Sequence, residues 1–438
     1  MYVPARRGFA AVNLVVAASL IGTGSLCAQE ESWRDFRGPA QNGCVAPAAV
    51  PLTWSEQQNV RWKSKIVGSG WSSPVVDDGK VWMTTATDGG KKLHVIAIDV
   101  ATGKQLHEQV VFENDKPEKK NALNSFASPS PVIEAGRVYV HFGTYGTACF
   151  DTKTFEQVWQ RRDLNCDHME GPGSSPVLFE NLLIFNADGG DVQFVVALDT
   201  ATGETKWRTD RSIELAGFAP DLRKAYSTPI VIDVAGKPQL ISSGAQGSYA
   251  YDPHTGKELW RVRYKGFSMA SRPMAGDGMV FVTTGFMRSS ILSVTVPVKA
   301  GSGPTTGGNK QAIGDVTDTH IAWSYSRNVP KMASAVLAGN RVFMVDDGGF
   351  ATCLDHQTGN VLWRQRVGGE HCASPLCVGD RIYFFDREGK TVVIDRGDVY
   401  KELASNHLDG GFMATPAVVG DAFLLRTRTH LYRIEAEQ

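Results

Sequence analysis

The sequence predicts an all-β fold, an eight-bladed β-propeller of four-stranded antiparallel blades whose last blade is closed by an N-terminal strand. Two observations support this prediction. A unit of about 40–50 residues recurs along the chain, and each unit carries four short strand patterns separated by turn residues. Glycine is abundant, with 45 of 438 residues, which agrees with many tight turns.

Each unit begins with a tract rich in Ser, Thr or Ala that leads into a short apolar strand. The starting positions are Pro74, Pro131, Pro176, Pro229, Pro273, Ala335, Pro375 and Pro416. A turn and an alternating second strand follow, as in Asp78-Gly79-Lys80-Val81-Trp82. The third strand then ends in an Asp-x-x-Thr-Gly turn, and the fourth strand carries a Trp. We expect these Trp side chains to pack between neighbouring blades: Trp159, Trp207, Trp260, Trp323 and Trp363.

The two ends of the chain predict how the ring closes. The eighth unit stops after three strand patterns, near Glu435, whereas residues 59–63 form a Trp-bearing strand with no preceding strands. We therefore expect this segment to complete the last blade, because a closed ring has no unpaired edge. A seven-bladed ring is the alternative.

The N-terminus has the layout of a secretory signal peptide. Arg6 and Arg7 precede an uncharged, largely apolar run, and cleavage is expected after Ala28. An uncleaved membrane anchor and lipidation at Cys27 are the alternatives. We thus expect a signal peptide at residues 1–28, an extension at 29–58 and a single propeller domain at 59–438, with no transmembrane helix after signal removal.

Two insertions interrupt the repeat. Residues 113–120 form a charged loop after the first unit, and the Gly-rich loop 297–318 lies inside the fifth. The second is expected to be a surface loop, and a functional loop is the alternative. Export would permit disulfides, but the spacing of the cysteines identifies no pair, and Cys149 and Cys353 are expected to be small buried residues of strands.

The repeated pattern Ala-Leu-Asp-x-x-Thr-Gly-x-x-x-Trp at Ala197–Trp207 resembles the tryptophan-docking motif of PQQ-like, quinoprotein-type propellers. That superfamily includes the quinoprotein alcohol dehydrogenases and the BamB-like assembly factors. The opening Trp33-Arg34-Asp35-Phe36-Arg37-Gly38-Pro39, with Trp71-Ser72-Ser73-Pro74, is also similar to exported PQQ-like repeat proteins of planctomycetes. The resemblance implies an eight-bladed fold and leaves the chemistry open, since the motif makes contacts between blades.

The quinoprotein resemblance implies a PQQ cofactor with calcium, an Asp base and two adjacent cysteines. This chain has no Cys-Cys pair and no CxxCH haem motif. We therefore expect no cofactor, no metal site and no catalytic residues. Two alternatives stay open: a PQQ-dependent oxidoreductase that has lost the cysteine pair, and a carbohydrate-binding or carbohydrate-cleaving propeller that uses Glu170 and Glu370.

The loop that leads into the innermost strand of each blade should open on the mouth of the central channel. This placement predicts a ring of binding candidates of mixed polar and aromatic character. The candidates are Trp71, Phe126, His168, Glu170, Tyr226, Arg272, Lys331, Glu370, His371 and Phe412.

These patterns together predict an exported binding or assembly scaffold with a protein partner in the cell envelope. The partner would add a strand to a blade edge or dock at the channel mouth. The formal net charge of −1 argues against a nucleic-acid partner. We expect a monomer located in the periplasm, at the cell envelope or outside the cell.

Overall fold

The computed structural model describes Met1 and residues 32–134, 136–297 and 314–437. The predicted signal peptide, its cleavage site and Cys27 lie outside the described residues, as does most of the Gly-rich loop 297–318. The regular secondary structure of the described residues is almost entirely β-strand. The exceptions are one short α-helix, α1 (Thr317–His320), and three 3₁₀ helices, η1 (Asp88–Gly90), η2 (Gly143–Tyr145) and η3 (Pro220–Leu222).

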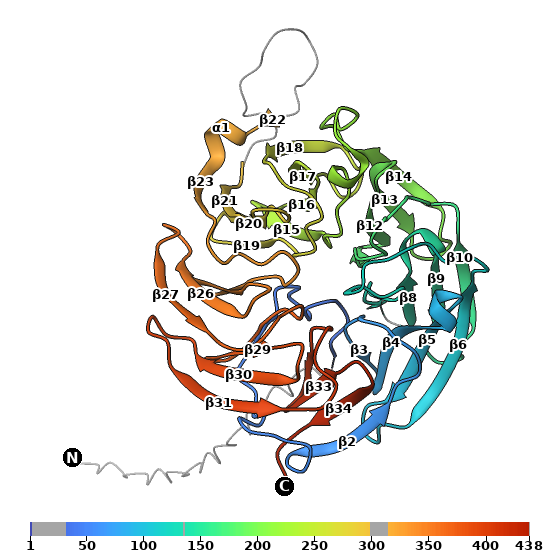
Figure 1. The fold of residues 1–438 in the computed structure, drawn as a ribbon, viewed down its shortest axis with the longest axis vertical. Coiled ribbons are helices and arrows are strands. Elements are labelled where there is room, and N and C mark those ends of the chain that lie inside the picture. The colour runs from blue at the N-terminus through green and yellow to red at the C-terminus, as the bar shows by residue number, and fades with distance from the viewer. Residues whose placement is uncertain (2–31, 135, 298–313, 438) are drawn as a thin grey trace.

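Eight antiparallel sheets surround a central axis (Figure 1). Blade 1 consists of β3 (Val75–Asp77), β4 (Lys80–Thr87), β5 (Lys92–Asp99) and β6 (Gln105–Glu113), and blade 2 of β7 (Val132–Glu134), β8 (Arg137–His141), β9 (Thr147–Asp151) and β10 (Gln157–Arg161). Blade 3 consists of β11 (Val177–Phe179), β12 (Leu182–Asp188), β13 (Gln193–Asp199) and β14 (Thr205–Asp210), and blade 4 of β15 (Ile230–Val234), β16 (Lys237–Gly244), β17 (Gly247–Tyr251) and β18 (Glu258–Arg263). The short first strand of each blade lies nearest the axis.

The remaining four blades complete the ring. Blade 5 consists of β19 (Met274–Gly276), β20 (Met279–Thr283), β21 (Ile291–Thr295) and β23 (Ile321–Tyr325), and blade 6 of β24 (Val336–Ala338), β25 (Arg341–Val345), β26 (Phe350–Asp355) and β27 (Val361–Arg366). Blade 7 consists of β28 (Leu376–Val378), β29 (Arg381–Phe385), β30 (Lys390–Asp395) and β31 (Glu402–His407), and blade 8 of β32 (Ala417–Val419), β33 (Ala422–Arg426), β34 (His430–Ile434) and β2 (Val60–Lys65). The prediction of eight blades is confirmed, and the seven-bladed alternative is wrong.

The ring is closed by β2, as the sequence predicts. This strand pairs antiparallel with β34, with Trp62 opposite Arg433 and Lys65 opposite His430. In Figure 1 the blue β2 lies beside the red β34, so the two ends of the chain share blade 8. The pairing removes the open edge that a three-stranded last blade would leave.

The first hairpin of blade 1 shows why glycine recurs between strands. Asp77 of β3 pairs with Lys80 of β4, which leaves only Asp78 and Gly79 to make the turn. Both turn residues have positive φ, 46° and 70°. A two-residue turn of this kind matches the right-handed twist of the paired strands, and Asp-Gly is among its preferred sequences.

The predicted tryptophan packing between blades is confirmed. The indole Nε1 of Trp207, in blade 3, donates to the carbonyl of Pro253 in the turn of blade 4 at 2.9 Å. A Cβ added to Gly256 of that turn would lie 2.4 Å from the Trp207 ring, so the ring packs directly on the glycine. Equivalent hydrogen bonds join Trp62 to Val100, Trp159 to Thr200, Trp323 to His356 and Trp363 to Gly397. Trp260 differs, because its indole donates to Gln239 within its own blade.

Two short segments extend the four-stranded pattern. Strand β22 (Gly314–Asp315) pairs in parallel with β18 on the outer edge of blade 4. Strand β1 (Cys44–Val45) pairs in parallel with β28 on the inner edge of blade 7. Blades 4 and 7 therefore have five strands, and the second addition brings the N-terminal extension into the channel.

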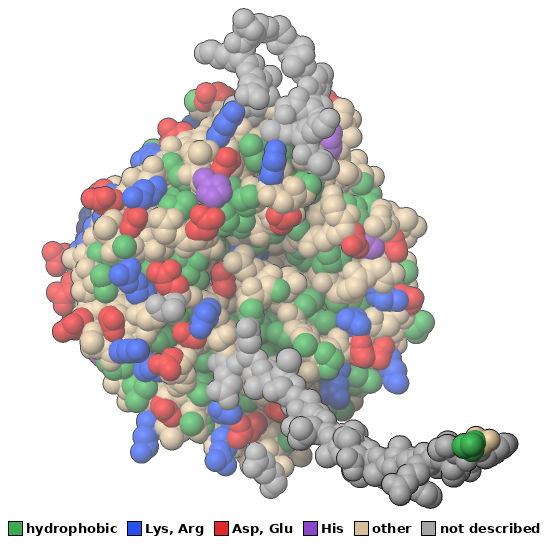
Figure 2. Space-filling view, turned by 180° about the vertical axis from the view of Figure 1, so that it is seen from behind, with side chains coloured by type: hydrophobic (Ala, Val, Ile, Leu, Met, Phe, Trp, Pro, Cys, Tyr) green, Lys and Arg blue, Asp and Glu red, His purple; other side chains and the backbone are tan. Residues whose placement is uncertain are grey.

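Positive and negative side chains are interspersed over the face drawn in Figure 2, in keeping with the near-zero net charge. Among the described residues, none of the helices has the length and hydropathy needed to cross a membrane.

Candidate functional site

The channel is lined first by a ring of hydroxyl groups that hydrogen-bond from blade to blade. One position per blade forms this lower ring: Ser73, Ser130, Ser175, Thr228, Arg272, Ser334, Ser374 and Thr415. The backbone N–H of Ser73 donates to Oγ of Ser130 at 2.9 Å, and five other blade junctions have the same bond. The recurring Ser and Thr of the lower ring therefore satisfy buried backbone N–H groups.

Arg272 occupies the one lower-ring position without a hydroxyl. Its guanidinium is buried and lies 3.2 Å from the Asp35 carboxylate, through Nη1. Nη1 also donates to the carbonyl of Phe36 at 2.6 Å, and Nη2 donates to Oε1 of Gln41 at 2.8 Å. All three partners belong to the N-terminal extension, so this departure from the repeat anchors a segment from outside the ring.

That segment, Trp33–Val45, crosses the channel, and we call it the plug. Trp33 exchanges two backbone hydrogen bonds of 2.8 Å with Val76 in blade 1. On the far side, the buried Arg37 donates to the carbonyls of Ser334 and Ala335 in blade 6, at 3.1 and 2.7 Å. Burial lowers the pKa of Arg37 to about 9. The plug thus spans the channel beneath the lower ring, from blade 1 to blades 5 and 6.

A second ring lies above the first, two residues earlier in each blade. This upper ring consists of Trp71, Ser128, Gly173, Tyr226, Ala270, Met332, Cys372 and Met413, and all eight residues line one cavity. The cavity, which we call the bowl, has a volume of about 630 Å³ and falls within the range of small-ligand and peptide pockets. Phe36 of the plug also lines the bowl, together with seven of the lower-ring residues.

The large side chains of the upper ring are held in place by hydrogen bonds. The Trp71 indole donates to the carbonyl of Leu123 at 3.1 Å, and the Tyr226 hydroxyl donates to the carbonyl of His168 at 2.7 Å. Burial raises the pKa of Tyr226, so this phenol stays protonated. Trp71 and Tyr226 therefore present fixed aromatic surface to the bowl.

Three cations line the bowl, and each faces a carboxylate. Lys224 pairs with Asp221 and lies 3.9 Å from Glu170. Lys331 lies 3.5 Å from Asp347. Burial raises the pKa of Asp347, against the opposing effect of Lys331.

The third pair joins Arg387 to Glu370. Glu170 is also fixed, because Nδ2 of Asn121 donates to its carboxylate at 3.0 Å. Asn121 follows directly after the charged loop 113–120 predicted from the sequence, so this insertion leads into the wall of the bowl. The charges around the bowl are satisfied within the protein.

The structure brings five of the ten predicted site residues together in the bowl: Trp71, Glu170, Tyr226, Lys331 and Glu370. The other five lie elsewhere. Arg272 lies in the lower ring against the plug. Phe412 is fully buried in the core near Phe385, and His371 is 1% exposed. Phe126 packs against Tyr145 at the junction of blades 1 and 2.

His168 is buried and braces the loop of the neighbouring blade. The backbone N–H of Thr144 donates to its Nε2 at 3.0 Å, so this nitrogen acts as an acceptor. Burial lowers the pKa of His168 to about 4, and burial lowers the pKa of the nearby His141 to about 3. Both imidazoles are therefore neutral at pH 7. They have a structural role and do not line the bowl.

Sequence reasoning missed the apolar part of the bowl. Its members include Leu123, Phe267, Phe286, Met287, Met332 and Met413. Some of these residues could have been predicted, because successive side chains of an extended chain point to opposite sides. A residue two positions before a lower-ring residue faces the bowl. This rule identifies Met413 and Cys372 as bowl residues, whereas their neighbours Phe412 and His371 are buried.

The bowl is a poor match for PQQ. PQQ is a tricarboxylate, and all three cations of the bowl already pair with carboxylates. Among the residues that the structure describes, no cluster of three or more His, Cys, Asp or Glu is arranged to hold a metal ion.

Glu170 and Glu370 approach the bowl from the loops that lead into blades 3 and 7, on opposite sides of an eight-membered ring. They therefore do not form a neighbouring pair, whereas glycoside hydrolysis places two carboxylates on either side of one bond.

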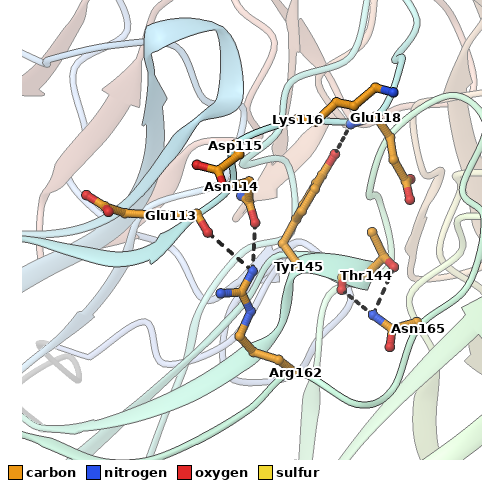
Figure 3. Close-up of a pocket in the computed structure, with 9 residues that line it drawn as sticks. All are labelled: Glu113, Asn114, Asp115, Lys116, Glu118, Thr144, Tyr145, Arg162 and Asn165. Atoms are coloured by element: carbon orange, nitrogen blue, oxygen red, sulfur yellow. Dashed lines mark hydrogen bonds between the residues drawn. The ribbon is translucent and has the colours of Figure 1, made fainter.

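A second cavity, of about 490 Å³, lies where the loop after blade 1 meets blade 2 (Figure 3). Its groups bond mainly to one another. Arg162 donates to Oδ1 of Asn114 at 2.8 Å, and the N–H of Glu118 donates to the Tyr145 hydroxyl at 2.9 Å. Burial raises the pKa of Tyr145 to about 12. These bonds fix the charged loop against the ring and make this cavity a structural junction.

Comparisons with known proteins agree with this architecture. The sequence model of the family described as outer membrane protein assembly factor BamB matches residues 52–161, 110–211, 191–335 and 322–401. BamB of Yersinia pestis is 22% identical over 409 residues, covering 89% of this chain and 92% of that protein. Tetrathionate hydrolase of Acidithiobacillus ferrooxidans is 24% identical over 142 residues, covering 31% of this chain and 28% of that protein.

Two solved structures share the fold. BamB of Moraxella catarrhalis superposes with a TM-score of 0.58 at 11% identity, covering 85% of this chain and 99% of that one. Quinohemoprotein alcohol dehydrogenase of Comamonas testosteroni superposes with a TM-score of 0.61 at 13% identity, covering 94% and 82%. The structural likeness supports the fold alone, whereas the family matches run from residue 52 to residue 401. The chain therefore belongs to the family of outer membrane protein assembly factor BamB.

Proposed function

We propose that this protein is a non-catalytic scaffold of the cell envelope that holds a segment of a protein partner in the bowl, in a BamB-like role in outer-membrane protein assembly. The observation that carries the proposal is the bowl itself. It has an open mouth, a floor occupied by Phe36 and the lower ring, and a wall that combines fixed aromatics with methionines. Such a site accepts a side chain or a chain segment from one side only.

The chemistry of the wall favours a protein segment with apolar side chains. Met287 is 79% exposed at the mouth, and Met332 and Met413 lie in the upper ring. Methionine is unbranched and adapts its shape, so these residues can fit varied apolar partners. The paired charges around them form a polar rim, and an apolar centre with a polar rim is the usual anatomy of a protein interface.

The proposal assigns no catalytic residue and no cofactor. Glu170 and Glu370 are engaged by Asn121 and Arg387, and the cations that a PQQ carboxylate would need are paired. The monomeric state and the cell-envelope location belong to the same proposal. Membership of the BamB family supports the location.

A pair of charge substitutions tests the bowl against the blade edge. Met413→Asp places a carboxylate in the upper ring, whereas Leu362→Asp places one on β27, where Leu362 is 38% exposed on an outer strand. Tagged variants would be purified from the native envelope after mild cross-linking, and the bound proteins identified by mass spectrometry. We expect Met413→Asp to lose at least 90% of the captured outer-membrane proteins or assembly factors, as an order-of-magnitude estimate for a desolvated charge, and Leu362→Asp to retain them.

Loss with Leu362→Asp alone would place the partner on a blade edge and overturn the bowl as the site. A titration with PQQ and calcium, followed by calorimetry and absorbance, tests the oxidoreductase alternative. Saturable one-to-one binding at micromolar affinity would overturn the non-catalytic role, and the account predicts none.

A further inference from the structure

The plug ends in a strand pairing that places two cysteines side by side. Strand β1 runs parallel to β28, with Cys44 in register with Cys377 and Val45 in register with Val378. The backbone N–H of Cys377 donates to the carbonyl of Gly43 at 2.8 Å, which fixes this register. Side chains of residues directly opposite each other in neighbouring strands project from the same face of a sheet.

The two cysteines belong to one apolar cluster. Cys44 packs against the cluster of blades 6 and 7 that contains Cys377. The Cys44 thiol donates to the carbonyl of Leu337 at 3.3 Å, and the Cys377 thiol donates to the carbonyl of Gly379 at 3.4 Å. Neighbouring strands lie about 4.7–4.9 Å apart, and disulfides span Cα separations of about 4.4–6.8 Å. The pairing therefore already meets the main geometric requirement for a covalent bond, although both cysteines are unbridged in the structure.

We infer that Cys44 and Cys377 form a disulfide that fastens the plug to blade 7 and so fixes the floor of the bowl. The bond forms as the two thiols lose two protons and two electrons. A protein dithiol–disulfide oxidant of an export compartment, or oxidised glutathione in a test tube, takes up the electrons and is reduced to thiols. The inference rests on the proposed location only for the identity of the cellular oxidant.

The thiol of Cys377 is the better nucleophile of the two. The neighbouring Cys44 lowers the pKa of Cys377, with a further contribution from Arg396, whereas the neighbouring Cys377 raises the pKa of Cys44. The thiolate is the reactive form in disulfide exchange. Because Cys377 is 2% exposed, attack on the oxidant requires the plug to open or to be still undocked.

The bond would tie together segments 333 positions apart in the chain, and it would act on the plug. Phe36 and the Asp35–Arg272 contact lie upstream of Cys44 in the same segment. A covalent link at the end of the plug keeps it at a high local concentration over its docking site. The oxidised protein should therefore open its plug less often than the reduced protein.

The test uses the full chain incubated with oxidised glutathione in mild denaturant, alkylated and digested without reduction. We expect a linked peptide pair carrying Cys44 and Cys377, and a fall in free thiols by two. Cys377→Ser should abolish the link, and Cys372→Ser should retain it, which is a sharp control because both cysteines lie between Arg366 and Arg381 and share a tryptic peptide.

Hydrogen exchange provides the functional measurement. The amide of Val76, which donates to Trp33 of the plug, should exchange at least tenfold more slowly in the oxidised wild type than in the reduced wild type, as an order-of-magnitude expectation for a tethered segment. Cys377→Ser should show no redox dependence. Two thiols that both stay alkylatable after oxidation, or a link through Cys372, would overturn the inference. None of these measurements involves a partner, so their failure is separate from any failure of the proposed scaffold role.

Discussion

Replacing Arg272 by serine separates the plug from the propeller that surrounds it. Serine is what most other blades carry at this position, so Arg272→Ser completes the lower ring with a hydroxyl that Thr228 can use. It also removes the guanidinium that contacts Asp35, Phe36 and Gln41. We expect the ring to stay folded and the plug to open far more often.

The size of the effect follows from the buried ion pair. The side chains of Arg272 and Asp35 are 1% and 9% exposed. Removing one partner of a buried pair costs about 3–5 kcal/mol, because the other charge stays buried without compensation. Since each 1.4 kcal/mol is a factor of ten, local opening of the plug should rise roughly 10²- to 10⁴-fold.

Native-state hydrogen exchange measures this opening directly. The amides of Val76, Ile133 and Cys377 donate to plug carbonyls and report on docking. They should exchange roughly 10²- to 10⁴-fold faster in Arg272→Ser, whereas strand amides inside the blades should not change. Ser175→Ala is the matched control, because it removes a lower-ring hydroxyl in blade 3, away from the arginine. Equal exchange in Arg272→Ser and the wild type would refute the assignment of Arg272 as the anchor.

Two further predictions concern stability. Trp207→Ala should lower the free energy of unfolding by about 3–5 kcal/mol, since it leaves a cavity and an unpaired carbonyl at the junction of blades 3 and 4; denaturant unfolding with no loss would contradict the docking role of the indole. The contribution of His141 and His168 to the unfolding free energy should be constant above pH 7 and should fall as the pH drops from about 6.5 to about 4, because the unfolded chain binds protons at both residues while burial holds their pKa values in the folded state at about 3 and about 4. The loss should reach about 3 kcal/mol for His168, and His168→Gln, which keeps an acceptor for the Thr144 N–H, should reduce the slope; an unchanged slope would contradict the assignment.

The sequence was sufficient for the ring because the repeat specifies each blade locally. The Ser-x-Pro tract, the Asp-Gly hairpin and the Thr-Gly turn before Trp each correspond to an observed contact. The additions escaped prediction because β1 and β22 are two-residue strands with no strand pattern of their own. They form only because a neighbouring edge is available, which depends on tertiary structure.

The location of the candidate site could be predicted from the sequence, but two of its predicted residues were one position out of phase. The loops that lead into the innermost strands do line the mouth, and Trp71 and Tyr226 lie in the upper ring as expected. Phe412 and His371 are one residue out of phase with Met413 and Cys372, so they point into the core. The role of Arg272 could not be predicted, because its partners in the plug are more than two hundred residues away in the sequence.

Site-specific photo-cross-linking in cells tests the central claim most directly, that the bowl is where a protein partner binds. A photoreactive residue would replace Met413 in the upper ring or Val361 on the outer strand β27, where Val361 is 46% exposed. The account predicts one discrete adduct with an outer-membrane protein or assembly factor from position 413 and none from position 361. Adducts from position 361 with none from position 413 would contradict it.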